Sequence, residues 1–316
     1  MYDFTIKTYE DLLKSLIDQG FLFQTFMGFI EKPGEKLIVL RHDVDQLPDS
    51  SSVFAKIEAK LGVKGTYYFR AVPESWDESI IKEIAGMGHE VGYHYEDVSL
   101  VAERLKAEGE RRREERVGEG GSGGRRDEDF EKELADIAIE SFERNLRRLR
   151  EIAPVKTICM HGSPMSRWDS RLLWKYYDYH DFGIIGEPYF DVNFDEVLYL
   201  TDTGRRWDGD SVNIRDKGLG TRDLELGSDF YTDWKVKPVK GSLMNMTTES
   251  INFQNKYKFR STFDIKKAAE KEELPDKIMM TFHPQRWTDK PGPWVRELVW
   301  QNVKNVGKYF VVKMRD

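Results

Sequence analysis

The chain has 316 residues, of which 39% are hydrophobic and 13% aromatic, so it can bury a sizeable core and is not expected to be globally disordered. The 49 Lys and Arg residues against 56 Asp and Glu give a formal net charge of −7. This charge argues against a nucleic-acid partner, because phosphate binding needs a basic face. The single cysteine, Cys159, excludes an intrachain disulfide.

The sequence shows neither a signal-peptide pattern nor an apolar run of about 18 residues, so we expect a cytoplasmic protein without a membrane partner. No pattern indicates an oligomeric state.

Strand-like and helical segments alternate along the chain. Helices are expected at 8–20, 49–61 and 76–87. Strands are expected at 37–40, 65–69, 90–94, 155–160, 196–200, 278–282 and 309–313. This alternation indicates an α/β fold with about seven parallel strands in a single domain over residues 1–316.

A charged insertion at about 97–130 interrupts this alternation. Two helical segments, 99–116 and 127–151, flank the linker-like sequence VGEGGSGGRR. The second has apolar residues at helical spacing and is expected to pack one face on the sheet. The first is rich in Glu, Arg and Lys, which favours a solvated helix over a partner-binding arm.

Ionisable residues stand where four of the expected strands end. The segments are RHDVD (41–45), GYHYE (92–96), CMHGS (159–163) and TFHPQRW (281–287). Active sites of parallel α/β proteins lie at the carboxyl ends of the strands. The four segments are therefore expected to meet at one site.

Alternation of side chains with period two assigns these residues to faces. Arg41, Asp43 and Asp45 share one face, whereas His42 points to the other. We expect His42, His89 and His180 to be structural, and His94, His161 and His283 to lie at the site.

Asp45 and His94, with one further ligand, would suit a divalent metal of the zinc, cobalt or iron type. Such a metal lowers the pKa of water and polarises a carbonyl. Asp43 would be free to accept a proton.

RHDVD, GTYYF, GHEVGYH and a late strand ending in histidine resemble the polysaccharide deacetylase family (NodB homology domain, carbohydrate esterase type). The resemblance covers roughly 35–100, 150–165 and the late strand, and leaves about 200–275 and the insertion unmatched. It implies a distorted (β/α) barrel that hydrolyses N- or O-acyl groups on sugars. It also implies a bound divalent metal, for which zinc is our first choice and cobalt, nickel or iron are alternatives.

By this resemblance Asp43 is the catalytic base, and Asp45 and His94 are metal ligands. His283 is the general acid that protonates the leaving amine, and Trp287 is expected to wall the site.

The chain departs from the family at the second ligand histidine, which would fall at Val98, and at the first motif, where Val44 separates the two acids. We expect His161 to supply the missing ligand, with Glu96 as the alternative. The family's third motif falls at His161-Gly162-Ser163-Pro164.

Arg205, Arg206 and Trp207 form a further candidate site. Guanidinium groups beside an indole can hold a carboxylate, a phosphate or a sugar ring, and a nucleotide-sugar would be a natural cytosolic ligand. An exposed turn with an ordinary salt bridge is the equal alternative.

The sequence therefore predicts a cytosolic metal-dependent hydrolase that removes an acetyl or other acyl group from an N-acylated sugar or a related small amide. Two alternatives stay open: an inactive barrel that binds a carbohydrate or nucleotide-sugar, and a metal-dependent phosphoesterase. Cys159 is expected to be a small core residue and not a nucleophile.

Overall fold

The computed structural model describes residues 2–115, 127–162, 168–207 and 234–313. Six parallel strands form an open, curled sheet in the order β5-β4-β3-β2-β7-β6, and β1 pairs with the first residues of β2. The strands are β1 (Leu22–Gln24), β2 (Leu37–Val44), β3 (Thr66–Phe69), β4 (Glu90–Tyr95), β5 (Ile158–Met160), β6 (Leu198–Thr201) and β7 (Lys277–Phe282).

The α/β class is confirmed, but the closed barrel is not: the sheet is a half-barrel. Its edge strands β5 and β6 do not pair with each other among the described residues. The strand predicted at 309–313 is wrong, because these residues continue helix α12 (Pro291–Lys313). A short apolar run such as YFVVK fits either period, and here the helix that precedes it decides.

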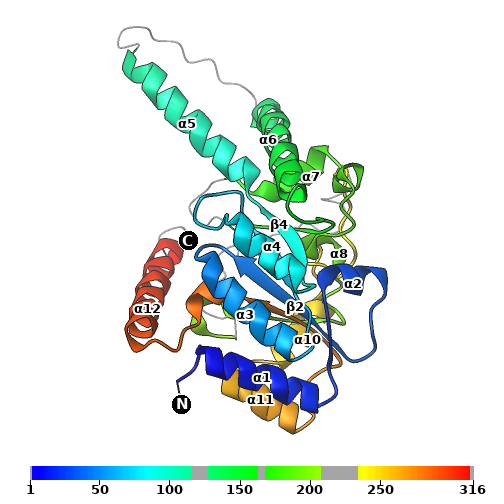
Figure 1. Cartoon of the computed structure of the whole chain (residues 1–316). Helices are drawn as coiled ribbons and strands as arrows, with labels where there is room; N and C mark the ends of the chain where they lie inside the picture. Colours follow the sequence, from blue (N-terminus) through cyan, green and yellow to red (C-terminus); the bar gives the residue numbers. More distant parts are fainter. Residues whose placement is uncertain (1, 116–126, 163–167, 208–233, 314–316) are drawn as a thin grey trace.

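The two faces of the sheet bury different side chains. One face, which includes Ile38 and Leu40, packs under α1, α3, α4, α6 and α11 in the main core (Figure 1). The other face, which includes Val39 and Met279, packs on Phe26 and a smaller apolar cluster. Burial on both faces is the reason that strand β2 begins with a continuous apolar run.

The helices of the main body are α1 (Ile6–Asp18), α2 (Phe26–Glu31), α3 (Pro48–Lys60), α4 (Glu78–Gly86), α7 (Leu173–Tyr176), α8 (Pro188–Asp191), α10 (Thr248–Lys256), α11 (Thr262–Glu270) and α12. Short 3₁₀ turns lie at η1 (Ser170–Leu172), η2 (Tyr179–Phe182), η3 (Thr203–Arg205) and η5 (Pro284–Arg286). Helix α1 begins earlier than predicted, because Thr5 and not Thr8 caps it: the Thr8 N–H donates to Thr5 Oγ1.

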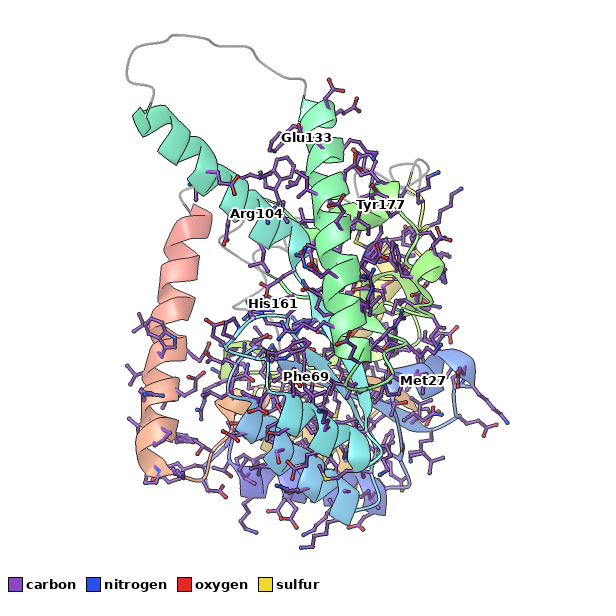
Figure 2. The ribbon with its side chains drawn as sticks, turned by 45° about the horizontal axis from the view of Figure 1, so that its top comes forward. Met27, Phe69, Arg104, Glu133, His161 and Tyr177 are labelled. Atoms are coloured by element: carbon purple, nitrogen blue, oxygen red, sulfur yellow. The ribbon has the colours of Figure 1, made fainter. Side chains whose placement is uncertain are left out.

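The predicted charged helices are confirmed as α5 (Asp97–Glu115) and α6 (Asp127–Arg150). Helix α6 packs on the sheet through one apolar face, with Leu134, Phe142 and Leu146 buried. Helix α5 extends away from the sheet (Figure 1), and in the view of Figure 2 His161 lies below Arg104 of α5 and Glu133 of α6. The predicted linker between them falls within 116–126, outside the described residues. No helix in the described part of the chain is long and apolar enough to span a bilayer.

Candidate active site

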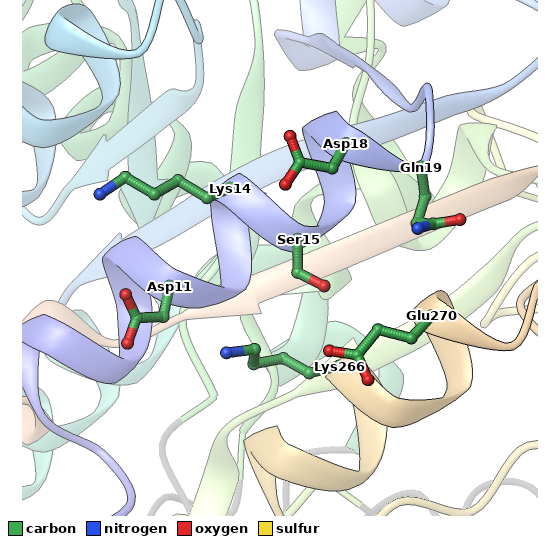
Figure 3. A pocket seen from close by; sticks show the side chains of 7 residues that line it. All are labelled: Asp11, Lys14, Ser15, Asp18, Gln19, Lys266 and Glu270. Atoms are coloured by element: carbon green, nitrogen blue, oxygen red, sulfur yellow. The ribbon is translucent and has the colours of Figure 1, made fainter.

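The candidate site lies at the carboxyl ends of the strands and is distinct from a polar surface pocket between α1 and α11. That pocket is lined by charged and polar side chains, and none of them belongs to the strand ends (Figure 3). Its acids and lysines, of which Lys14, Asp18 and Glu270 are exposed, are those of an ordinary solvated surface.

Asp45, His94 and His161 converge at the ends of β2, β4 and β5. The His161 Nδ1 atom lies 3.2 Å from His94 Nε2 and 3.2 Å from Asp45 Oδ1, and His94 Nε2 lies 3.6 Å from Asp45 Oδ1. Ligand atoms about 2.0–2.2 Å from a tetrahedral zinc are about 3.3–3.6 Å apart. The three atoms therefore have the separations of one face of a tetrahedral metal site.

The hydrogen bonds of these residues leave their ligand atoms available. The His94 Nδ1 atom is 2.9 Å from the Cys159 carbonyl, so it carries the proton and leaves the Nε2 lone pair facing Asp45. Asp45 Oδ1 is buried without a hydrogen-bond partner in the described structure. Gln285 donates to the other oxygen, Oδ2, at 3.2 Å. A buried unpartnered carboxylate oxygen beside two imidazole nitrogens fits a divalent cation.

Asp43 lies next to this triad but is held by a different partner. Arg41 donates to both Asp43 oxygens, from Nε at 2.9 Å and from Nη2 at 2.7 Å. His94 Nε2 is farther away, 3.9 Å from Asp43 Oδ2. Burial raises the pKa of the Asp43 carboxyl, but the paired charge and hydrogen bonds of Arg41 oppose this, and the pKa lies well below its usual range. Asp43 is therefore ionised at neutral pH.

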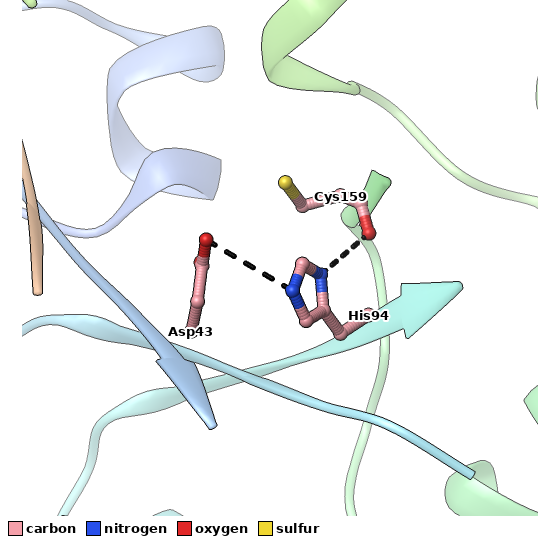
Figure 4. Close-up of side chains that lie close together, drawn as sticks. All are labelled: Asp43, His94 and Cys159. Carbon is pink, nitrogen blue, oxygen red and sulfur yellow. Dashed lines mark hydrogen bonds and ion pairs between the residues drawn. The ribbon is translucent and has the colours of Figure 1, made fainter. Parts of the chain in front are cut away.

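Asp43, His94 and Cys159 also lie close enough to form a second ligand set (Figure 4). Arg41 already neutralises Asp43, and burial raises the pKa of the Cys159 thiol, so this set is the poorer cation site. The geometry favours the set that contains Asp45.

His283 approaches the triad from β7, with Nε2 3.9 Å from Asp45 Oδ2. Its Nδ1 atom is 2.5 Å from Asp202 Oδ1, and Asp202 Oδ2 accepts from the Trp287 indole at 2.6 Å. Burial raises the pKa of the Asp202 carboxyl, but the charge of His283 outweighs it and lowers the pKa. The ring of His283 is thus fixed with Nε2 toward the site.

Of the predicted substrate-binding residues, Arg205 and Trp207 make contacts within the fold. The Arg205 guanidinium stacks between the rings of Phe4 and Trp294, and its nitrogens lie 3.4 Å from two backbone carbonyls. Trp207 is buried and donates to Thr262 Oγ1. Arg206 is half-buried.

Trp287 and the structural histidines lie around the site without belonging to the triad. Trp287 is buried behind the site and bonds Asp202. His42 and His89 both contact the buried carboxylate of Glu58. His42, on the opposite face of β2, places Nε2 2.9 Å from Oε1, and His89, at the start of β4, places Nδ1 3.4 Å from Oε2. The last two residues of the predicted third motif, Ser163 and Pro164, lie outside the described residues.

Reasoning from the sequence did not single out the roles of Asp202 and Arg70. One simple signal would have found them, because the residue directly after each of the strands β2 to β7 is ionisable and lies at this site. In chain order these residues are Asp45, Arg70, Glu96, His161, Asp202 and His283.

Comparisons of the chain with protein-family models, curated proteins and solved structures found no significant match. The resemblance to the polysaccharide deacetylase family therefore depends on the short motifs named above.

Proposed function

We propose that the protein is a metal-dependent hydrolase that removes an acyl group from an N-acylated sugar or a related small amide. The observation that carries the proposal is the triangle formed by Asp45, His94 and His161, with edges of 3.2, 3.2 and 3.6 Å. The motif resemblance supports the choice of an acylated sugar as substrate.

A divalent cation of the zinc type, held by Asp45, His94 and His161, would supply a water of lowered pKa and polarise the acyl carbonyl. Asp43 is the base in this proposal. Because Arg41 holds Asp43 ionised, its carboxylate can accept a proton from water at any pH near neutrality. A carboxylate held in this way is a weak base, so the reaction depends on that lowered water pKa.

His283 is the proposed acid, since its Nδ1 atom is engaged by Asp202 and Nε2 points toward Asp45. From that position a protonated Nε2 can donate to the leaving nitrogen as the C–N bond breaks. Base and acid thus approach the triad from β2 and β7.

The test combines metal analysis with an acetate-release assay on the full chain. After loading with Zn²⁺ or Co²⁺, we expect about one metal ion per chain and release of acetate from members of a panel of N-acetylated sugars and nucleotide-sugars. Chelation should stop the release and metal should restore it. Asp43→Asn is expected to bind metal as the wild type does and to release acetate 10²–10⁴ times more slowly.

Failure to bind metal under any loading condition would contradict the proposal and favour a carbohydrate-binding barrel without activity. Phosphate release from generic phosphate esters, without acetate release, would instead indicate a phosphoesterase.

A further inference from the structure

Arg70 and Glu96 form a clamp behind the ligand triad. The Arg70 guanidinium donates to both Glu96 oxygens, from Nε at 2.6 Å and from Nη2 at 2.8 Å, and its Nη1 atom donates to the Asp45 carbonyl at 3.0 Å. Arg70 follows β3, between the strand ends that carry Asp45 and Glu96. One side chain therefore joins three adjacent strand ends.

Glu96 reaches the triad through His161. The Glu96 Oε2 atom lies 3.9 Å from His161 Nε2, while the other ring nitrogen, Nδ1, faces His94 and Asp45. A neutral imidazole that presents Nδ1 as a ligand must carry its proton on Nε2. That proton faces the carboxylate of Glu96, a residue that is only 4% exposed.

Glu96 is not itself a member of the ligand set. Among the described residues, two groups have ligand atoms that all lie within 4.8 Å of one another: Asp45, His94 and His161, and Asp43, His94 and Cys159. Glu96 belongs to neither group. Its two oxygens are already engaged by Arg70.

Val98 stands where the polysaccharide deacetylase family, which the motifs resemble, has its second ligand histidine, and residue 98 cannot serve as a metal ligand here. Val98 is fully buried in the main core, because it lies in the first turn of α5 with its side chain toward the sheet. A ligand at residue 98 would have to leave that core. The third ligand must therefore come from another strand, as His161 does.

We propose that the Arg70–Glu96 pair is a positioning device that fixes the tautomer and orientation of His161 as the third metal ligand. This inference rests on the proposed metal-dependent function and extends it. The 3.9 Å separation of Glu96 Oε2 and His161 Nε2 is beyond hydrogen-bond range, but a carboxylate that faces the distal N–H of a ligand histidine favours that tautomer electrostatically and raises the basicity of the ligand. The pair thus supports a ligand that replaces the one excluded at Val98.

The experiment measures Zn²⁺ affinity by competition with a chromophoric chelator, on the full chain. Glu96→Gln is expected to weaken binding 10–100-fold. The double variant Arg70→Met/Glu96→Leu removes both charges together, leaves no unpaired charge, and should weaken binding to a similar extent. The matched control is Glu131→Gln, which breaks a half-exposed ion pair with Lys175 away from the site and should leave the affinity unchanged.

Two spectroscopic readouts separate positioning from general stability. In the Zn²⁺-loaded wild type, ¹⁵N chemical shifts of the His161 ring should show the metal on Nδ1 and the proton on Nε2, and the reverse assignment would overturn the inference. The Co²⁺ absorption spectrum of Glu96→Gln at saturation should match that of the wild type, because the ligands are the same. A changed spectrum would make Glu96 a direct ligand.

The outcomes distinguish this inference from the function on which it rests. A wild type that binds Zn²⁺ tightly, with Glu96→Gln within two-fold of it, overturns the positioning role and leaves the hydrolase proposal intact. A wild type that binds no metal overturns both.

Discussion

His283 and Asp202 form a buried pair in which the carboxylate decides where the imidazole proton sits. Asp202 is fully buried and accepts hydrogen bonds from His283 Nδ1, from the His283 backbone N–H at 2.9 Å and from the Trp287 indole. Arg286 Nη1 also donates to Oδ1, at 3.4 Å, so four donors hold the carboxylate in one orientation. Nε2 of His283 is therefore the nitrogen that remains for chemistry.

We predict that Asp202→Asn lowers kcat by 10²–10⁴ while Zn²⁺ affinity stays within about three-fold of the wild type. The amide can offer an N–H to Nδ1 and so favours the wrong tautomer, as happens when the carboxylate of a catalytic triad is replaced by an amide. Steady-state kinetics on the substrate found in the acetate-release panel, with chelator competition, would measure both quantities.

Asp178→Asn is the matched control, because Asp178 makes the same contact with Nδ1 of the exposed His180, at 2.6 Å. It should leave kcat unchanged. Equal rates in Asp202→Asn and the wild type would remove His283 from the role of acid.

At the residue scale, the sequence indicates those site residues whose chemistry is visible on their own strand. Asp43, Asp45 and His94 stand at strand ends with the period that puts them on one face. The partner of His283 is 81 positions away at Asp202, and that pairing depends on β6 lying beside β7. Strand order is a property of the whole sheet, so local patterns do not reveal it.

At the scale of elements, Asp97 joins β4, α5 and α6. It is the first residue of α5, is fully buried, and accepts from Tyr93 Oη at 2.7 Å and from Asn145 Nδ2 at 2.9 Å. Burial raises the pKa of this carboxyl to about 6, although the hydrogen bonds of Tyr93 and Asn145 oppose the shift. An unfolded Asp has a pKa of about 4.

The folded chain therefore binds this proton more tightly than the unfolded chain does. Between pH ~4 and ~6 the folded state carries more protons, so the Asp97 contribution to stability falls as the pH rises through this window, by roughly 3 kcal/mol in total. Asp97→Asn removes the titration. We predict that the variant loses this part of the pH dependence of the free energy of unfolding, measured by urea titrations from pH 4 to 7.

Glu140→Gln, an exposed position on α6, should keep the wild-type slope. If Asp97→Asn also kept that slope, Asp97 would not be the group responsible.

A substitution of Phe142 can show whether α6, the charged helix that follows the insertion, is part of the core. Its ring contacts Tyr93 and Tyr95 of β4 and Trp174 of α7, and it is fully buried. We predict that Phe142→Ala lowers the free energy of unfolding by 3–5 kcal/mol, because it leaves a cavity under the sheet. Chemical denaturation would measure the loss.

Val299→Ala on α12 is the control, since Val299 is 57% exposed, and should change stability by no more than about 0.5 kcal/mol. A similarly small effect of Phe142→Ala would show that α6 contributes little to folding.

Element type could be predicted where the sequence pattern was clear, as for the continuous apolar run of β2 and the helical apolar spacing of α6. It failed at 309–313, where five residues cannot fix a period, and it missed β1, whose three residues LFQ carry no alternation. The closed barrel failed for another reason: it came from the family resemblance, whereas closure depends on whether the two edge strands meet.

At the scale of the whole molecule, an open sheet must be held together without the pairing that would close a barrel. The candidate metal ligands lie at the ends of β2, β4 and β5, which span four of the six strands in the sheet order, and His283 adds the end of β7. A cation bound by Asp45, His94 and His161 would tie these strand ends together in the folded state only. Binding of the cation should therefore raise the free energy of unfolding of the whole domain and not only order one loop.

We predict that free Zn²⁺ at 100 times its Kd raises the free energy of unfolding by about 2.7 kcal/mol, as mass action requires for a ligand that binds only the folded chain. Thermal or urea unfolding with and without buffered Zn²⁺ would measure the increase. His94→Ala should abolish it, because His94 supplies one of the three ligand atoms, whereas His180→Ala, at an exposed histidine away from the sheet, should retain it. An equal response of His94→Ala and the wild type would mean that the cation binds elsewhere, and the strand-end site would then not be the metal centre.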